Sequence, residues 1–163
     1  MTQSPTATLP ARASASSAPP VARASAARAV TQAPAAAVQA LAFAEPMPGF
    51  PGYRDYVLIP ADPSGRVYWL QSVAPDGPRF LAVPAAPYFP DYAPALPPAV
   101  CAELGLDGAS DADLFCVVTV PDGDVAAATA NLRAPVVVNS ATQQARQVVL
   151  SDGAHPIRRP LRR

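Results

Sequence analysis

The sequence of 163 residues contains little of the chemistry that metal sites require. It has no lysine, a single histidine, His155, and two cysteines, Cys101 and Cys116. Structural zinc sites need four cysteine or histidine ligands, and these residues do not supply four. Each cysteine lies in an apolar run, which favours a buried free thiol over a disulfide. We therefore expect no metal site and no cofactor.

The sequence also lacks recognisable catalytic motifs and membrane-spanning segments. The sequence has no Gly-x-Ser-x-Gly, phosphate-binding-loop or dinucleotide-binding motif. A lone histidine near a chain terminus is usually a surface residue. No stretch approaches the roughly 20 apolar residues of a transmembrane helix, and the start lacks the apolar segment of a secretory signal. We expect a cytoplasmic protein that is neither an enzyme nor bound to a membrane.

Two pairs of aspartates are the best candidates for binding a hard cation. Asp111 and Asp113 precede the apolar run Leu114–Val120, and Asp122 and Asp124 follow it. A calcium-binding loop needs more oxygen ligands at fixed spacing and a closing glutamate, which this segment lacks. We favour turn-forming, solvent-exposed aspartates at the ends of a strand.

The first 36 residues differ in composition from the rest. They comprise 13 Ala, 5 Ser, 5 Pro and 4 Thr among only a few larger aliphatic residues. Such a segment buries too little apolar surface to offset the entropy lost on ordering. We predict a disordered tail at residues 1–36, a folded domain at residues 37–160 and a basic end at residues 161–163.

The net charge of zero conceals an uneven distribution. Residues 38–157 carry five arginines and all twelve acidic residues, a net charge of −7, whereas both ends are basic. An acidic domain is poorly suited to a phosphate backbone and well suited to a basic protein. The alternative hypothesis is a nucleic-acid-binding protein that uses its arginine-rich termini.

The folded part consists of short apolar runs separated by Gly- and Pro-rich turns. The runs are Val38–Phe43, Tyr56–Ile59, Val67–Val73, Phe80–Val83, Leu114–Val120, Val136–Val138 and Gln147–Leu150. About seven short strands of this kind predict an all-β domain, either a small barrel or a sandwich. One short helix is predicted at the segment that begins with Pro98 and stops at Gly105.

The segment Thr129–Asn139 has an unusual pattern for a buried strand. Asn131 and Asn139 frame a run that starts at Pro135. Asparagine and proline are both depleted in strands. Their side-chain amides either close local turns or pair with the backbone of a partner. The sequence leaves both interpretations open.

A Pro-rich passage contains aromatic side chains that are candidates for an interface. Tyr88, Phe89 and Tyr92 surround Pro90 and Asp91. Aromatic residues on a stiff loop often anchor protein interfaces, although burial in the core explains them equally well.

Several segments, taken in order, resemble the bacterial flagellar assembly factor FliW family. They are Pro48–Tyr53, Tyr56–Pro60, Trp69–Val73, Phe89–Tyr92, Glu103–Leu106, Val118–Val120, Thr129–Pro135, Val138–Asn139, Gln147–Leu150 and Ile157–Arg158. The resemblance covers about residues 38–160. The tail has no counterpart in a typical family domain, and His155 and Arg159 stand where the family commonly has an aromatic residue and a histidine.

The resemblance implies a binding protein. Proteins of this family bind the RNA-binding translational regulator CsrA, relieve its repression of flagellin synthesis, and also bind flagellin as a cytoplasmic partner. Such proteins therefore switch partners when flagellin accumulates, and no direct binding of nucleic acid is expected. The candidate partner-binding residues are Phe50, Tyr88, Phe89, Asp91, Tyr92, Asn131 and Asn139.

Deletion of residues 1–36 tests the predicted domain boundary. Because this segment buries little apolar surface, the truncated chain should unfold at nearly the same temperature as the full chain. Thermal unfolding followed by circular dichroism measures both midpoints. A large drop in the midpoint on deletion would show that the segment packs against the domain.

Overall fold

The structure is a computed structural model that describes residues 37–161. The predicted disordered tail lies outside these residues, as do the last two arginines of the predicted basic end. Within the described range no helix has the length and apolar character needed to cross a membrane.

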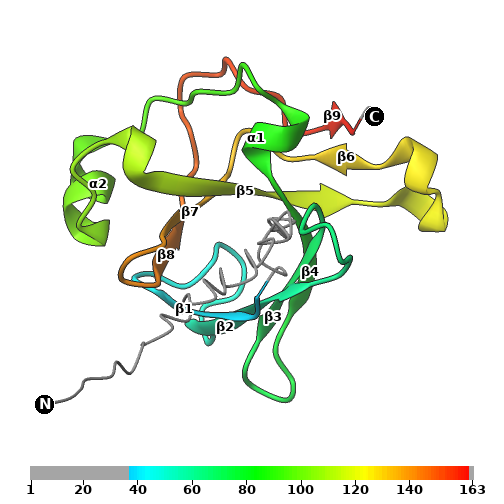
Figure 1. Ribbon diagram of the computed structural model, residues 1–163, viewed down its shortest axis with the longest axis horizontal. Coiled ribbons are helices and arrows are strands. Elements are labelled where there is room, and N and C mark those ends of the chain that lie inside the picture. The colour runs from blue at the N-terminus through cyan, green and yellow to red at the C-terminus, as the bar shows by residue number, and fades with distance from the viewer. Residues whose placement is uncertain (1–36, 162–163) are drawn as a thin grey trace, which may run out of the picture. The chain divides into compact units, whose positions relative to one another are not determined.

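Seven strands form a closed barrel (Figure 1). They are β1 (Gln39–Phe43), β2 (Asp55–Pro60), β3 (Tyr68–Ser72), β4 (Arg79–Pro84), β5 (Ala112–Thr119), β7 (Val136–Asn139) and β8 (Gln144–Gln147). Their order around the barrel is β4-β3-β2-β1-β8-β7-β5, and pairing of β4 with β5 closes it. All of these pairs are antiparallel except β1 with β8. The predicted all-β domain with about seven short strands is confirmed, and the barrel is the form it takes.

The interior of the barrel holds one apolar core. Alternate residues of each strand point inward, and the largest of them are the aromatic residues Phe43, Tyr56 and Phe115. The ring of Phe43 lies 4.8 Å from that of Tyr56, measured between centroids.

The outer face of the barrel carries two further apolar clusters, which explains why β5 is apolar on both faces. Phe115 and Val117 of β5 pack with the interior core, whereas Cys116 and Val118 pack with an outer cluster. This outer cluster lies against β4, β5 and β6, and the second lies between α2 and the ends of β7 and β8. A strand that separates two cores has no face left for polar residues.

Within residues 37–161, two short helices lie outside the barrel. The predicted helix is confirmed as α2 (Pro98–Leu104), which ends at Gly105 in the left-handed region with a φ of 65°. The helix α1 (Ala85–Tyr88) was not predicted, because a single turn within a Pro-rich passage shows no helical periodicity. Three 3₁₀ turns also occur, η1 (Ala109–Asp111), η2 (Pro121–Gly123) and η3 (Val125–Ala127).

The C-terminal part of the chain departs from the predicted strand boundaries. The run predicted at Gln147–Leu150 is a strand only up to Gln147, and β8 begins earlier, at Gln144. Two strands of two residues, β6 (Thr129–Ala130) and β9 (Arg159–Pro160), extend the sheet beyond β5. Elements this short carry no alternation that a sequence pattern can reveal.

The two cysteines are free thiols in different surroundings. Cys116 is completely buried in the outer cluster on β5, and burial raises the pKa of its thiol to about 12. Cys101 is partly exposed on α2.

The turn between β3 and β4 requires glycine at position 77. A Cβ atom built on Gly77 would overlap the Cβ and Oγ atoms of Ser72, which is buried. Gly77→Ala should therefore lower the free energy of unfolding by about 1–3 kcal/mol through overpacking. Urea unfolding measures the change. Gly52→Ala, where a Cβ meets nothing within 4 Å, is the matched control and should change stability little; equal stability of the two variants would contradict the steric explanation.

Candidate protein interface

Four of the predicted contact residues lie together after β4, in residues 88–92, which we call the aromatic loop. Tyr88 ends α1, and Phe89, Asp91 and Tyr92 come directly after it. The loop is turned by two backbone hydrogen bonds, from Phe89 N to Ala85 O at 2.8 Å and from Tyr92 N to Phe89 O at 3.0 Å. The ring centroids of Tyr88 and Phe89 lie 6.3 Å apart.

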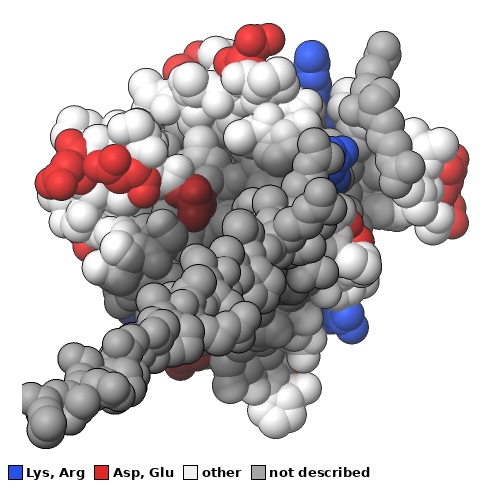
Figure 2. Space-filling model, in the orientation of Figure 1, with Lys and Arg blue, Asp and Glu red and all other residues white. Residues whose placement is uncertain are grey.

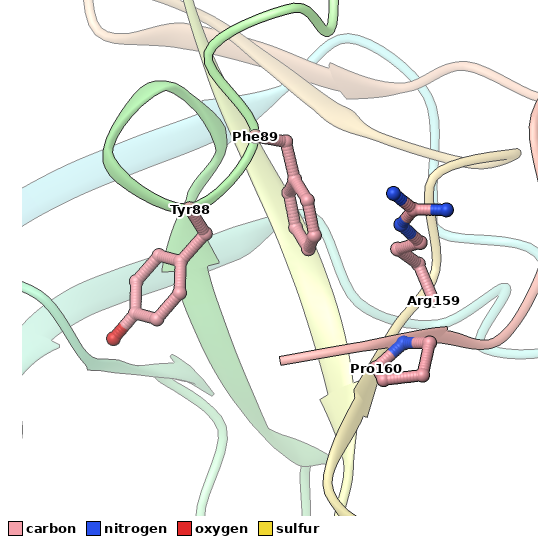
Figure 3. Close-up of a pocket in the computed structure, with 4 residues that line it drawn as sticks. All are labelled: Tyr88, Phe89, Arg159 and Pro160. Carbon is pink, nitrogen blue, oxygen red and sulfur yellow. The ribbon is translucent and has the colours of Figure 1, made fainter. Parts of the chain in front are cut away.

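The C-terminal strand β9 completes two adjoining hollows beside this loop. One, of about 330 Å³, is lined by Tyr88, Phe89, Arg159 and Pro160. Figure 3 shows Phe89 and Arg159 on opposite sides of it, with Tyr88 extending away from Arg159. The other, of about 290 Å³, is lined by residues 88–92 together with Leu132, Ala154, His155, Pro156 and Arg159. Aromatic, cationic and acidic groups therefore meet at one place.

Tyr92 holds the aromatic loop onto the rest of the domain. Its hydroxyl donates a hydrogen bond of 2.6 Å to the carbonyl oxygen of Leu132, and burial raises the pKa of this hydroxyl far above its ordinary value. Its ring and that of His155 lie in an edge-to-face arrangement, with centroids 4.9 Å apart. Tyr92 thus joins three segments that are distant in the sequence.

Asn131 shapes the segment to which Tyr92 binds. Its Oδ1 atom accepts hydrogen bonds from the backbone N–H groups of Arg133 at 3.0 Å and Ala134 at 3.2 Å. This is an Asx-type turn, which takes the chain from β6 to β7. Arg133 then donates from Nε to the carbonyl oxygen of His155 at 3.1 Å. Asn131 therefore directly precedes Leu132, which lines the second of the two hollows.

Asn139 is buried at another position. Its Nδ2 group donates to the carbonyl oxygens of Leu104 at 2.8 Å and Gly105 at 3.2 Å, at the end of α2. Its Oδ1 atom accepts from the N–H groups of Ala141 at 2.9 Å and Thr142 at 3.3 Å, in the β7–β8 turn. Both ends of the amide are occupied within the chain, so Asn139 ties the helix to the hairpin.

Phe50 is separate from the aromatic loop as well. It packs beside the interior core, with its ring 5.1 Å from that of Phe80 in an edge-to-face arrangement. The structure thus brings together Tyr88, Phe89, Asp91 and Tyr92, with Asn131 behind them, and leaves Phe50 and Asn139 outside the hollows. A partner-binding role for these seven residues stays a prediction.

Seven residues that line the two hollows were not among the predicted contacts, namely Pro90, Leu132, Ala154, His155, Pro156, Arg159 and Pro160. His155 and Arg159 stand at the positions where the sequence departs from the FliW pattern, and this departure was the available signal.

A second surface is acidic. Glu103, Asp107, Asp111 and Asp113 are all exposed within eleven residues that connect α2 to the start of β5. Figure 2 shows acidic side chains gathered over this part of the barrel. Arg146 forms ion pairs with Glu103 and, at 2.9 Å, with Glu45. Across residues 37–161, no three His, Cys, Asp or Glu side chains form a group that could hold a metal ion.

Comparisons with known proteins give matches to one family. The family model described as "FliW protein" matches residues 25–161. A flagellar assembly factor FliW from Moorella thermoacetica is 33% identical over 121 residues, covering 74% of this chain and 77% of the relative. One from Bdellovibrio bacteriovorus is 38% identical over 122 residues, covering 74% and 69%.

A solved structure agrees with the sequence comparisons. The crystal structure of a flagellar assembly factor FliW superimposes with a TM-score of 0.67 at 28% identity, covering 76% of this chain and 85% of that chain. The barrel is therefore shared with that protein.

Replacement of Asn139 tests its structural task. Asn139→Ala leaves two helix-terminal carbonyls and two turn N–H groups without their partner, which should cost about 2–3 kcal/mol of stability. Thermal unfolding in the absence of any partner measures this loss. Ser140→Ala, at the exposed neighbouring position, is the control and should unfold close to wild type. If Asn139→Ala is as stable as the control, these hydrogen bonds do not hold the hairpin to α2.

Proposed function

Because this chain belongs to the FliW family of flagellar assembly factors, we propose that it binds a CsrA-like translational regulator and flagellin. Binding of the regulator relieves its repression of flagellin synthesis, and accumulating flagellin takes the protein away from the regulator. Both partners meet it in the cytoplasm, and its role is binding rather than catalysis. The observation that carries this proposal is the family match, which extends through residues 25–161.

The charge of the domain supports a basic partner. Residues 37–161 contain seven arginines and twelve acidic residues, a net charge of −5, and one acidic surface lies beside α2. CsrA-like regulators are basic proteins. Opposite net charges raise the rate of association, and salt weakens the effect. Charge of this sign also disfavours direct binding to RNA.

The aromatic hollows support the choice of contact residues. We assign Tyr88, Phe89 and Asp91 to direct contact, because their side chains line hollows at the surface. We assign Tyr92, Asn131 and Asn139 to positioning, because the Tyr92 hydroxyl, Asn131 Oδ1 and both ends of the Asn139 amide are hydrogen-bonded within the chain. Phe50 is retained as a peripheral contact that the hollows do not include.

The proposal predicts two binary complexes. The full chain should bind the CsrA-like regulator and, separately, the flagellin of the same organism at micromolar concentration or tighter. Isothermal titration calorimetry with each purified partner measures both affinities. The association rate with the regulator should fall as salt rises.

Two outcomes contradict the proposal. If both partners are soluble and neither binds, the assigned partners are wrong. If instead RNA binds with a steep salt dependence that disappears when residues 1–36 and 158–163 are deleted, the arginine-rich ends carry a nucleic-acid function.

A further inference from the structure

Residues 37–161 cover the outer apolar cluster on β4 and β5 over only part of its area. An apolar groove of about 650 Å³ remains open beside it. The groove is lined by Val67, Leu81, Val83, Tyr88, Val120, Val125, Ala126, Ala128 and Leu161. Val83 and Ala128 are buried members of the outer cluster, so the floor of the groove is the surface of a core. The rest of the lining leaves apolar side chains in contact with water.

One wall of the groove presents an exposed aliphatic side chain. Val125 is 75% exposed, more than the other large apolar residues of the described domain. It lies on the excursion Pro121–Ala127, which leaves the barrel between β5 and β6. An exposed valine beside an open apolar groove enlarges one contiguous apolar surface, which is typical of an interaction site.

The excursion is held in a defined conformation. The Oδ1 atom of Asp124 accepts a hydrogen bond of 2.9 Å from Ala126 N, and Asp124 N donates to Pro121 O at 2.8 Å. Asp122 has a φ of 49°, in the left-handed region. These contacts keep Val125 in place next to the groove.

The rim of the groove is acidic on this side. Asp122 and Asp124 are exposed, and neither takes part in an ion pair with another residue of the 37–161 range. Figure 2 shows acidic side chains at the tip of this excursion, on the right of the view. An apolar floor next to unpaired negative charge is complementary to an apolar segment that carries basic residues at its edge.

The groove also borders the aromatic hollows, because Tyr88 lines all three. We propose that the groove formed by Val67, Leu81, Val125 and Leu161 binds an apolar segment of the CsrA-like regulator, with basic residues of that segment facing Asp122 and Asp124. The assignment rests on the proposed function, which supplies the basic partner. Val125 is the apolar anchor, and the two aspartates set the association rate.

The test uses Val125→Asp in the full chain, with the purified regulator and purified flagellin as the two probes. A charge in the groove should weaken binding of the regulator by at least about tenfold, as for an anchor at the centre of an interface. Val73→Asp is the matched control, since Val73 is 63% exposed and does not line the groove. Calorimetry measures the affinities, and thermal unfolding confirms that both variants are folded.

Asp122→Asn provides an independent measurement of the rim. Asparagine tolerates the left-handed conformation, so this change removes the charge without straining the turn. The association rate with the regulator should fall about two- to fivefold at low salt, and the difference from wild type should vanish at high salt.

The results separate failure of the groove from failure of the function. If the wild-type chain binds neither probe, the proposed function is wrong. If the wild-type chain binds the regulator, and Val125→Asp binds it as tightly as the control Val73→Asp does, the groove assignment is wrong. Loss of flagellin binding alone in Val125→Asp would likewise overturn the choice of the regulator as occupant.

Discussion

The pairing of β4 with β5 is the interaction on which the rest of this domain depends. It joins residues 81–84 to residues 115–118 and turns an open sheet into a barrel. Closure removes the two exposed edges that these strands would otherwise have. It also produces a wall with apolar side chains on both faces, the inner face filling the barrel and the outer face requiring a second cover.

The remaining elements serve to cover that outer surface. Helix α2 packs over the ends of β7 and β8. The Nδ2 group of Asn139 donates hydrogen bonds to the carbonyl oxygens at the end of this helix. The aromatic loop, residues 128–132 and Leu161 pack against the outer face of β5, and the hydrogen bond from Tyr92 to Leu132 ties the first two of these together. Among residues 37–161 the cover stops short near Val125, which leaves part of this apolar wall open as the groove.

The strands were predictable from the sequence because they repeat a local pattern, whereas the choice between a barrel and a sandwich was left open. Runs such as Tyr56–Ile59 and Leu114–Val120 are long enough to be recognised and are separated by clear turns. The elements β6, β9 and α1 were missed because two to four residues show no period. The site was predictable only in part. Tyr88, Phe89 and Tyr92 stood out by composition, whereas the approach of Tyr92 to Leu132, forty residues away, is set by tertiary packing.

The contrast between the two thiols has a practical consequence. Cys116 is enclosed in the outer cluster with its thiol held protonated at neutral pH, whereas the thiolate is the form that attacks thiol-reactive reagents. A fluorescent maleimide should therefore label the folded domain at a single position, Cys101 on α2. That label would report from beside the acidic surface without occupying the groove or the aromatic loop.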